Sequence, residues 1–499
     1  MTELTRSSGI ILHPTSLPGP DGIGDLGPEA YRWVDFLDQS GCSIWQVLPL
    51  GPTGYGDSPY QCFSAFAGSP FLISPTLLLE AGLLRPADLA KRPVFPIERV
   101  DFGPVIQWKL KILDVAFERY NKNPPKKMAA SFDLFQRNQS SWLYDFSLFM
   151  AIKESLGGVA WGEWPEPLRM RDMEAIKEFS RAHIQDINRH AFRQFLFHEQ
   201  WSNLKRYANR KGIRIMGDMP LYIAYDSSDC WSHTELFSVN KQGRLTTVAG
   251  VPPDYFSPTG QLWGNPLYKW PVHEQSGYAW WIDRTHSALE LFDFVRIDHF
   301  RGFAAYWEIK AGAETAEYGR WVKGPGVKFF KALEKAIHPL PIIAEDLGVI
   351  TEDVVALRDQ FNLPGMKILQ FAFDCPDNVF LPNHYPRNCV AYTGTHDNDT
   401  SRGWYQSAPA EEQDFCRRYL ARPGEDIAWD FIRAVWSSVA NFALAPLQDM
   451  LGLDTGARMN YPSRPSGNWS WRFQPGMVNL ELSERVRELN MLYDRMKPG

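Results

Sequence analysis

The sequence predicts an α/β protein in which eight parallel strands close into a (β/α)8, or TIM, barrel. Short apolar runs alternate with helical patterns along the chain, the order that produces parallel strands joined by crossover helices. Most of these runs are continuously apolar, as expected for strands buried on both faces. Eight such units favour a closed barrel over an open sheet.

The expected strands follow one another along the chain at residues 9–13, 43–50, 213–220, 292–299, 341–346, 366–373, 390–395 and, with the weakest pattern, 457–461. Helical periodicity is clearest at residues 28–40 and 182–211, and in an amphipathic tail at 480–496. Each expected helix therefore follows or precedes an expected strand, as a barrel requires.

The chain is longer than a barrel needs, since 499 residues exceed the roughly 250 of a simple (β/α)8 domain. We expect a single catalytic domain over residues 1–499 with large, mostly helical insertions. One inserted, mainly helical subdomain is expected at about residues 51–185, between strands two and three. A second inserted segment, at about residues 226–290, would carry a substrate loop at 250–268.

Composition excludes several classes of partner. The net charge is −6 and no Lys/Arg tract stands out, which disfavours nucleic acid and anionic membranes. The first residues lack a signal-peptide pattern, no run approaches a membrane span of about 20 apolar residues, and six scattered cysteines are typical of reduced thiols. We therefore expect a cytoplasmic protein. The 19 tryptophans are a high number, and flat apolar side chains are typical of sugar-binding clefts.

Asp298 ends one expected strand. Side chains alternate between faces along a strand, so Arg296 and Asp298 point the same way. A guanidinium at this distance is expected to lower the pKa of the carboxyl and keep it ionised, which suits a nucleophile. A purely structural ion pair is the alternative.

Glu345 ends the next strand, after the apolar residues 342–344. Apolar surroundings raise the pKa of a carboxyl and keep its proton near neutral pH, as a general acid needs. A helix cap is the alternative for Glu345, and Asp346, on the opposite face, is expected to be structural.

Asp397 follows His396 at the end of a third strand, where it could stabilise developing positive charge or hold sugar hydroxyls. The alternative is a polar turn or a cation loop. An EF-hand is disfavoured, because Arg402 and Ala408 stand where its glycine and glutamate should be. We expect no metal. Asp218, at the end of the third strand, is either a supporting group or a turn residue.

The segment 250–268 is rich in glycine and proline but contains Tyr255, Phe256 and Trp263. Aromatic residues in such a loop favour a substrate-binding lid, with a packed Ω-loop as the alternative. The glycine pattern at residues 22–27 has the letters of a dinucleotide fingerprint but does not directly follow a strand. No cofactor is expected.

Several segments together resemble the amylomaltase family, the 4-alpha-glucanotransferases of glycoside hydrolase family 77 in the alpha-amylase clan. They keep the family's order and span most of the chain, at residues 13–18, 54–63, 217–220, 250–268, 295–302, 344–348, 393–400 and 458–472. The lack of room for a C-terminal β-sandwich domain after the last strand also fits this family.

The resemblance implies that Asp298 is the nucleophile, Glu345 the acid/base and Asp397 the transition-state stabiliser. The residues assigned to substrate binding are Tyr60, Asp218, Tyr255, Phe256, Trp263, Asn265, Arg296, His299, His396 and Asn468.

The activity implied is transfer of α-1,4-glucan segments from a donor to a glucose or maltodextrin acceptor, in the metabolism of starch, glycogen or maltodextrin. The route would be a retaining double displacement through a covalent glucosyl-enzyme, with the two carboxyls about 5–5.5 Å apart. The alternatives are an α-glucan hydrolase of the same clan and, more remotely, a non-catalytic maltodextrin-binding protein.

Overall fold

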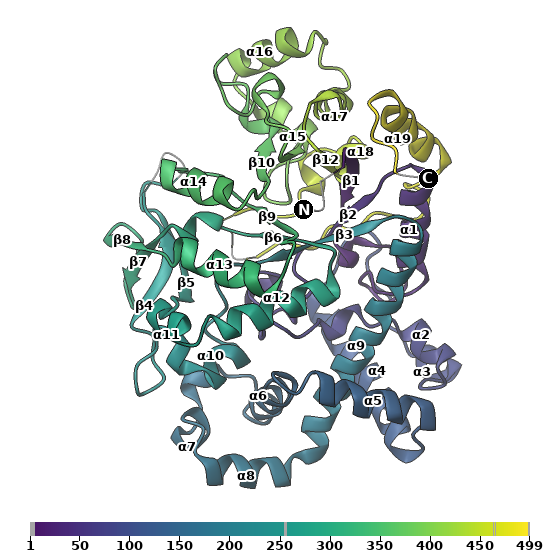
Figure 1. Ribbon diagram of the computed structural model, residues 1–499. Helices are drawn as coiled ribbons and strands as arrows, with labels where there is room; N and C mark the ends of the chain where they lie inside the picture. Colours follow the sequence, from purple (N-terminus) through teal and green to yellow (C-terminus); the bar gives the residue numbers. More distant parts are fainter. Residues whose placement is uncertain (1–4, 254–256, 463, 465, 498–499) are drawn as a thin grey trace.

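The computed structural model describes residues 5–253, 257–462, 464 and 466–497 (Figure 1). Eight parallel strands form its central sheet. These strands are β1 Ser7–Ile11, β2 Ile44–Gln46, β3 Arg214–Met219, β6 Phe294–Ile297, β9 Ile342–Ala344, β10 Gly365–Ile368, β11 Cys389–Tyr392 and β12 Phe442–Pro446. Their order in the sheet, β10-β11-β12-β1-β2-β3-β6-β9, follows the chain around a nearly closed barrel, which confirms the predicted fold class.

Two hydrogen bonds span the remaining seam of the barrel, between β9 and β10. The amide of Ala344 donates to the carbonyl of Pro364 over 2.9 Å. The amide of Met366 donates to Oδ1 of Asp346 over 2.7 Å. Asp346 therefore links the last pair of strands, which is the structural role expected for it.

Side chains from all the barrel strands fill its interior. They form one apolar cluster of Ile11, Ile44, Met216, Phe294, Ile343, Met366, Ile368, Val390, Tyr392, Phe442 and Leu444. The alternate residues of the same strands face outward and, apart from Lys367 of β10, are also buried. This double burial is why the strands read as continuous apolar runs.

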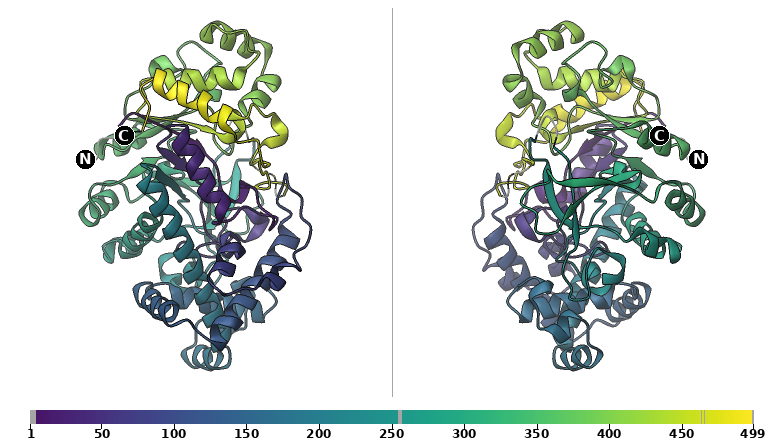
Figure 2. Two further views of the ribbon diagram at one scale, coloured as in Figure 1. Left: turned by 90° about the vertical axis from the view of Figure 1, so that its right-hand side faces the viewer. Right: turned by 90° about the vertical axis from the view of Figure 1, so that its left-hand side faces the viewer.

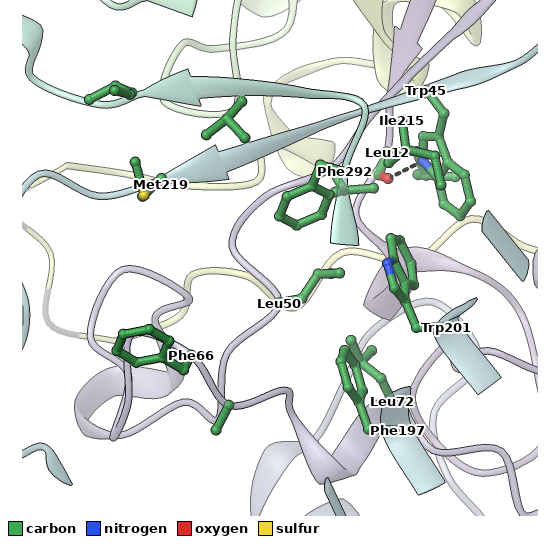
Figure 3. Packing of buried hydrophobic residues seen from close by; sticks show 14 of the residues in the cluster. Leu12, Trp45, Leu50, Phe66, Leu72, Phe197, Trp201, Ile215, Met219 and Phe292 are labelled. Carbon is green, nitrogen blue, oxygen red and sulfur yellow. Dashed lines mark hydrogen bonds between the residues drawn. The ribbon is translucent and has the colours of Figure 1, made fainter. Parts of the chain in front are cut away.

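Helices cover the outside of the barrel (Figure 2). Those that follow the barrel strands include α1 Pro28–Gln39, α9 Ile184–Arg210, α12 Ala279–Leu291, α13 Gly326–Ala336, α14 Glu352–Gln360, α15 Ser401–Ser407, α16 Ala410–Leu420, α17 Ile427–Ser437, α18 Leu447–Met450 and α19 Leu480–Leu492. Where α9 meets the barrel, Trp201 packs beside Trp45, whose indole N–H donates to the carbonyl of Leu12 over 2.7 Å (Figure 3). None of the helices in the described residues is long and apolar enough to cross a membrane.

A block of further helices follows β2 and precedes β3 in the chain, and it lies at the bottom of Figure 1. It contains α2 Pro75–Glu80, α3 Pro86–Leu89, α4 Phe102–Lys122, α5 Lys126–Asn138, α6 Leu143–Ser155, α7 Glu166–Arg169 and α8 Met173–Ala182. These helices occupy the span for which the sequence predicts an insertion. That residues 51–185 form a separate subdomain stays a prediction.

The predicted substrate loop at 250–268 is in part a β-hairpin, contrary to expectation. Its strands, β4 Thr247–Val251 and β5 Gln261–Pro266, belong to a four-stranded antiparallel sheet of order β5-β4-β7-β8. The other two strands are β7 Ala305–Lys310 and β8 Gly319–Lys323, which lie beyond the expected insertion at 226–290. The same region holds α10 Ser228–Ser232 and α11 Trp270–Gln275. Glycine and proline hid the strand pattern, because both disfavour strands unless their neighbours supply the pairing.

The eighth strand was predicted at the wrong place. Residues 457–461 contain no strand, and β12 instead occupies Phe442–Pro446. This run is short, has two alanines and ends in proline, so its local pattern is weak. It becomes a strand because β1 and β11 pair with it from both sides.

Arg495 fastens the C-terminal segment to the barrel. Its guanidinium is fully buried. It donates to backbone carbonyls of Ser7, Trp436, Ser438, Ala440 and Asn441. Since Ser7 begins β1 and Asn441 precedes β12, this contact lies at the N-terminal ends of the strands.

Candidate active site

The three predicted acidic residues lie at the C-terminal ends of the barrel strands. Asp298 and Glu345 come immediately after β6 and β9, and Asp397 lies in the loop after β11. Because the strands are parallel, these ends meet at one mouth of the barrel, where (β/α)8 enzymes carry their active sites. The carboxyls of Glu345 and Asp397 both act electrostatically on Asp298, so the structure brings all three together.

Arg296 is the central cation of the site. Its Nε and Nη2 lie 2.9 Å and 2.7 Å from Oδ2 of Asp218, and its Nη2 lies 3.0 Å from Oδ1 of Asp298. Arg296 and Asp218 are buried, whereas the side chain of Asp298 is 33% exposed. The expected contact between Arg296 and Asp298 is therefore present, but Asp218 makes the closer one.

The pKa of Asp298 differs from the expectation. Burial, the largest effect, and the carboxylates of Asp218, Glu345 and Asp397 raise it well above its usual range, although Arg296 acts in the opposite direction. The sequence predicted a lowered pKa because it showed Arg296 next to Asp298, but it showed neither the burial of Asp298 nor the neighbouring carboxylate of Asp218.

Glu345 is held by backbone amides at both oxygens. Its Oε2 accepts from the N–H of His299 over 2.6 Å, and its Oε1 accepts from the N–H of Leu347 over 2.9 Å. Burial outweighs these hydrogen bonds and raises the pKa of Glu345 to about 7. The predicted rise is confirmed, and a carboxyl with this pKa can give and take a proton near neutral pH.

Tyr60 connects the pair Arg296 and Asp218 to His396. Its hydroxyl donates to Oδ2 of Asp218 over 2.8 Å and accepts from Nη2 of Arg296 over 3.2 Å. It also lies 2.8 Å from Nε2 of His396, and the two rings are stacked with centroids 5.3 Å apart. Since the single hydroxyl hydrogen goes to Asp218, Nε2 of His396 must carry a proton. Burial lowers the pKa of His396, so its neutral Nε2–H form fits this contact.

Asp397 is the most open of the three carboxylates, with its side chain 47% exposed. Its Oδ2 lies 3.4 Å from Nε2 of His396. Its Oδ1 accepts from Nδ2 of Asn460 over 2.6 Å, and its carbonyl accepts from Nη2 of Arg458 over 2.6 Å. We missed these two residues in the sequence, although both fall in a segment that carried the family resemblance, because they lie in the span read as a weak strand.

Aromatic residues border the mouth. Trp263 of β5 lies edge-on to His299, with ring centroids 4.8 Å apart, and is tilted against Tyr222. Trp469 is tilted against both Tyr60 and His396, at 5.8 Å and 5.9 Å, a contact the sequence did not reveal. These rings give the site apolar walls of the kind that sugar rings pack against.

Two predicted binding residues use their amides within the protein. Asn265 is buried, donates to the carbonyl of Ile223 over 2.8 Å, and so fixes the end of β5. Asn468 accepts from the amide of Tyr461 and donates to the carbonyl of Arg464, each over 2.9 Å. Their contact with substrate stays a prediction. Tyr255 and Phe256 lie outside the described residues.

The described residues contain no group of three or more His, Cys, Asp or Glu side chains arranged to hold a metal ion. The polar groups at the mouth are the carboxylates, Arg296, Tyr60 and His396. Paired carboxyls beside one buried cation are suited to nucleophilic and acid/base steps at a sugar carbon.

Comparison with known proteins agrees with this reading. The 4-alpha-glucanotransferase model of glycoside hydrolase family 77 matches residues 12–479. The 4-alpha-glucanotransferase of Thermus thermophilus is 51% identical, over 99% of this chain and 100% of that protein. The chloroplastic/amyloplastic enzyme of Arabidopsis thaliana is 45% identical, over 99% of this chain and 86% of that one.

Solved structures extend the comparison. The amylomaltase from Streptococcus agalactiae in complex with acarbose superposes with a TM-score of 0.96 at 38% identity, covering 98% of this chain and 100% of that one. The amylomaltase from Corynebacterium glutamicum gives 0.77 at 19% identity, covering 99% and 75%, and shows the same fold.

Proposed function

The chain belongs to the 4-alpha-glucanotransferase family, glycoside hydrolase family 77 of the alpha-amylase clan, and on this premise we propose how its site carries out glucan transfer. The relatives at 44–51% identity are 4-alpha-glucanotransferases over the full chain, so this chain is a transferase and not a hydrolase of the same clan. The residue roles below are our assignments.

In the first step, a carboxylate oxygen of Asp298 attacks C1 of a glucose unit in an α-1,4-glucan. Glu345 gives its proton to the departing O4, so the bond between C1 and O4 breaks as the bond between C1 and Asp298 forms. The products are a β-linked glycosyl-enzyme and a shortened glucan with a free 4-OH.

In the second step, the 4-OH of an acceptor attacks the same C1. Glu345, now ionised, takes the hydroxyl proton, and Asp298 leaves as a carboxylate. Two inversions restore the α configuration. The acceptor is glucose or a maltodextrin.

We assign the proton of the resting site to Glu345. Of the two carboxyls, Asp298 is the one in contact with Arg296, and a neighbouring cation favours the charged form. Glu345 is buried, and its pKa of about 7 leaves a large protonated fraction at neutral pH. The contact between Arg296 and Asp298 is the observation that carries the mechanism.

Asp397, His396 and Arg296 complete the proposed sugar site. Asp397 lies close enough to act electrostatically on Asp298, and its half-exposed carboxylate can meet positive charge developing at C1 or accept from sugar hydroxyls. His396 donates from Nε2 to the hydroxyl of Tyr60 and stacks on its ring, which holds Tyr60 in place beside the sugar. Tyr60, Trp263 and His299 supply ring faces and edges around the same space.

The mechanism is tested by Asp298→Asn and Glu345→Gln with maltotriose as donor and acceptor. The unaltered protein should yield a ladder of longer maltodextrins, and each variant should lose at least about three orders of magnitude in rate. The control Asp359→Asn makes the same chemical change at an exposed carboxylate of α14 and should keep the ladder. A variant at Asp298 with near-normal rate and normal melting temperature would remove it as the nucleophile.

We further propose that the protein acts in the cytoplasm, on starch- or glycogen-derived maltodextrins, and has no nucleic-acid partner. The cytoplasmic proposal rests on the six cysteines, all of which are unpaired. The proposal that nucleic acid is not a partner rests on the net charge of −6. Retention of the protein on heparin or DNA columns at physiological salt would contradict this proposal.

A further inference from the structure

Asn460 and Arg458 form a closed ring of hydrogen bonds with Asp397. Arg458 donates from Nη2 to the carbonyl of Asp397 over 2.6 Å and from Nε to the carbonyl of Asn460 over 2.7 Å. Asn460 completes the ring by donating from Nδ2 to Oδ1 of Asp397 over 2.6 Å. One residue thus holds the backbone of Asp397 while the other holds its side chain.

The ring itself is anchored to its own segment. The guanidinium of Arg458 lies 4.5 Å over the ring of Tyr461, whose hydroxyl donates to the carbonyl of Thr455 over 3.2 Å. Thr455 in turn donates to Oδ2 of Asp399 over 2.8 Å. The segment 455–461 is therefore attached to the loop after β11 at both Asp397 and Asp399.

Asp397 needs such support because little else restrains it. It lies in a loop, and its side chain is 47% exposed toward the mouth of the barrel. Asp298 and Glu345, in contrast, directly follow strands, and both oxygens of Glu345 accept backbone amides. An exposed side chain is free to change rotamer, and an error of about 1 Å in a catalytic group is costly.

The hydrogen bond also determines which oxygen is available. A carboxylate only accepts hydrogen bonds, so the amide nitrogen of Asn460 must face Oδ1. With Oδ1 engaged by Asn460, Oδ2 is the oxygen beside His396. Oδ2 is then the oxygen of Asp397 that remains to face a sugar.

We propose that Asn460 is a positioning residue for the transfer reaction, which holds the carboxylate of Asp397 so that Oδ2 faces the sugar in the transition state. The inference rests on the role proposed above for Asp397. Asn460 acts through Asp397 and does not itself contact the sugar.

The experiment is a double-mutant cycle in the full-length protein with Asn460→Ala, Asp397→Asn and the double variant. A nitrophenyl maltooligosaccharide donor keeps residual turnover measurable, because its leaving group departs easily. We expect Asn460→Ala to lower kcat by about 10- to 100-fold, the range for a hydrogen bond to a charged group, with KM changed less than about threefold. In the Asp397→Asn background, the same change should cost no further kcat.

Two more variants separate positioning from folding. Asn388→Ala removes exposed side-chain hydrogen bonds to Asn362 just before β11, at the end of that strand away from Asp397, and it should leave kcat unchanged. Asn460→Asp keeps the size of the side chain but loses the donor, so it should lower kcat at least as much as Asn460→Ala. Asn460→Asp tests the positioning role if Asn460→Ala does not fold.

Each other outcome has a definite meaning. Normal kcat in both Asn460 variants, with Asp397→Asn impaired, overturns the positioning role and leaves the mechanism intact. If Asn460→Ala lowers kcat equally in the unaltered protein and in the Asp397→Asn background, the effect is a general structural one and the positioning role is overturned. A rise in KM alone would indicate that Asn460 contacts the sugar directly and would also overturn that role. Near-normal turnover of Asp397→Asn overturns the role of Asp397 itself, and the inference with it.

Discussion

His299, the residue after Asp298, donates its backbone N–H to Oε2 of Glu345 over 2.6 Å. The backbone of His299 adopts φ 55°, in the left-handed region. The amide of Phe300 also donates to the carbonyl of Glu345, over 3.1 Å. The turn that follows the proposed nucleophile therefore fixes both the backbone and the carboxyl of the proposed acid.

The pKa of about 7 at Glu345 predicts an alkaline limit to activity. The first chemical step needs the protonated carboxyl, so kcat/KM should fall as pH rises through about 7. Initial rates of maltotriose disproportionation between pH 5 and 9 measure this fall in kcat/KM. A rate that stays flat to pH 9 would contradict the assignment of the acid.

The same proton affects stability, with a definite sign. The folded protein holds it more tightly than the unfolded chain, because burial raises the pKa of Glu345 from an ordinary 4.5. The stabilisation is fully present below about pH 4.5 and is lost as pH rises through about 7. Glu345→Gln cannot ionise, so urea titrations should show its unfolding free energy rising relative to the unaltered protein over this interval.

The left-handed turn predicts an order of stability among variants at residue 299. His299→Ala and His299→Gly both lose the ring beside Trp263, but alanine costs roughly 1–2 kcal/mol in this conformation and glycine does not. The unfolded chain of the glycine variant has more conformational freedom, which offsets about 0.4–1 kcal/mol of this difference. We therefore expect His299→Gly to be the more stable by up to about 1.6 kcal/mol in urea unfolding. Alanine equal to or above glycine would show that the turn is not under strain.

Asp218 is expected to matter for stability as well as for activity. It is fully buried against Arg296, and Asp218→Asn would leave that guanidinium with less compensating charge. We expect a loss of about 3 kcal/mol in unfolding free energy. Glu29→Gln, which breaks an exposed ion pair with Arg32, is the control and should cost less than about 1 kcal/mol. A loss at Asp218 as small as that of the control would show that Arg296 finds other partners.

Trp263 should influence the choice between an acceptor sugar and water. Its ring borders the mouth beside His299, where it can contact an acceptor and exclude water. We expect Trp263→Ala to raise the ratio of hydrolysis to transfer, measured as total reducing ends against the maltodextrin ladder, and Trp263→Phe to raise it less. Equal ratios of hydrolysis to transfer in all three proteins would show that Trp263 does not influence this choice.

The sequence predicted the barrel and the position of the acidic residues at one mouth because both depend on local patterns. Doubly buried strands must be apolar throughout, so Phe294–Ile297 and Cys389–Tyr392 were recognisable without their neighbours. Carboxylates directly after such strands could be placed at one mouth from the parallel topology alone. The alternation along the strand also predicted the contact between Arg296 and Asp298.

What the sequence missed depends on partners distant in the chain. Phe442–Pro446 is a strand because β1 and β11 flank it, and the hairpin strand Gln261–Pro266 is one because β4 pairs with it. The pKa of Asp298 was predicted in the wrong direction because the fold buries this carboxyl and brings Asp218, on another strand, close to it. Asn460 was missed as a partner of Asp397 for the same reason, since its contact crosses between two loops.

The buried guanidinium of Arg495 joins β1, β12 and the C-terminal segment at the end of the barrel away from the acidic residues. The cylinder therefore has a buried cross-link at one pole and its acidic residues at the other. New stabilising contacts added near Arg495 would lie at the pole away from the carboxylates, where longer storage or hotter starch processing could be sought with the mouth left as it is.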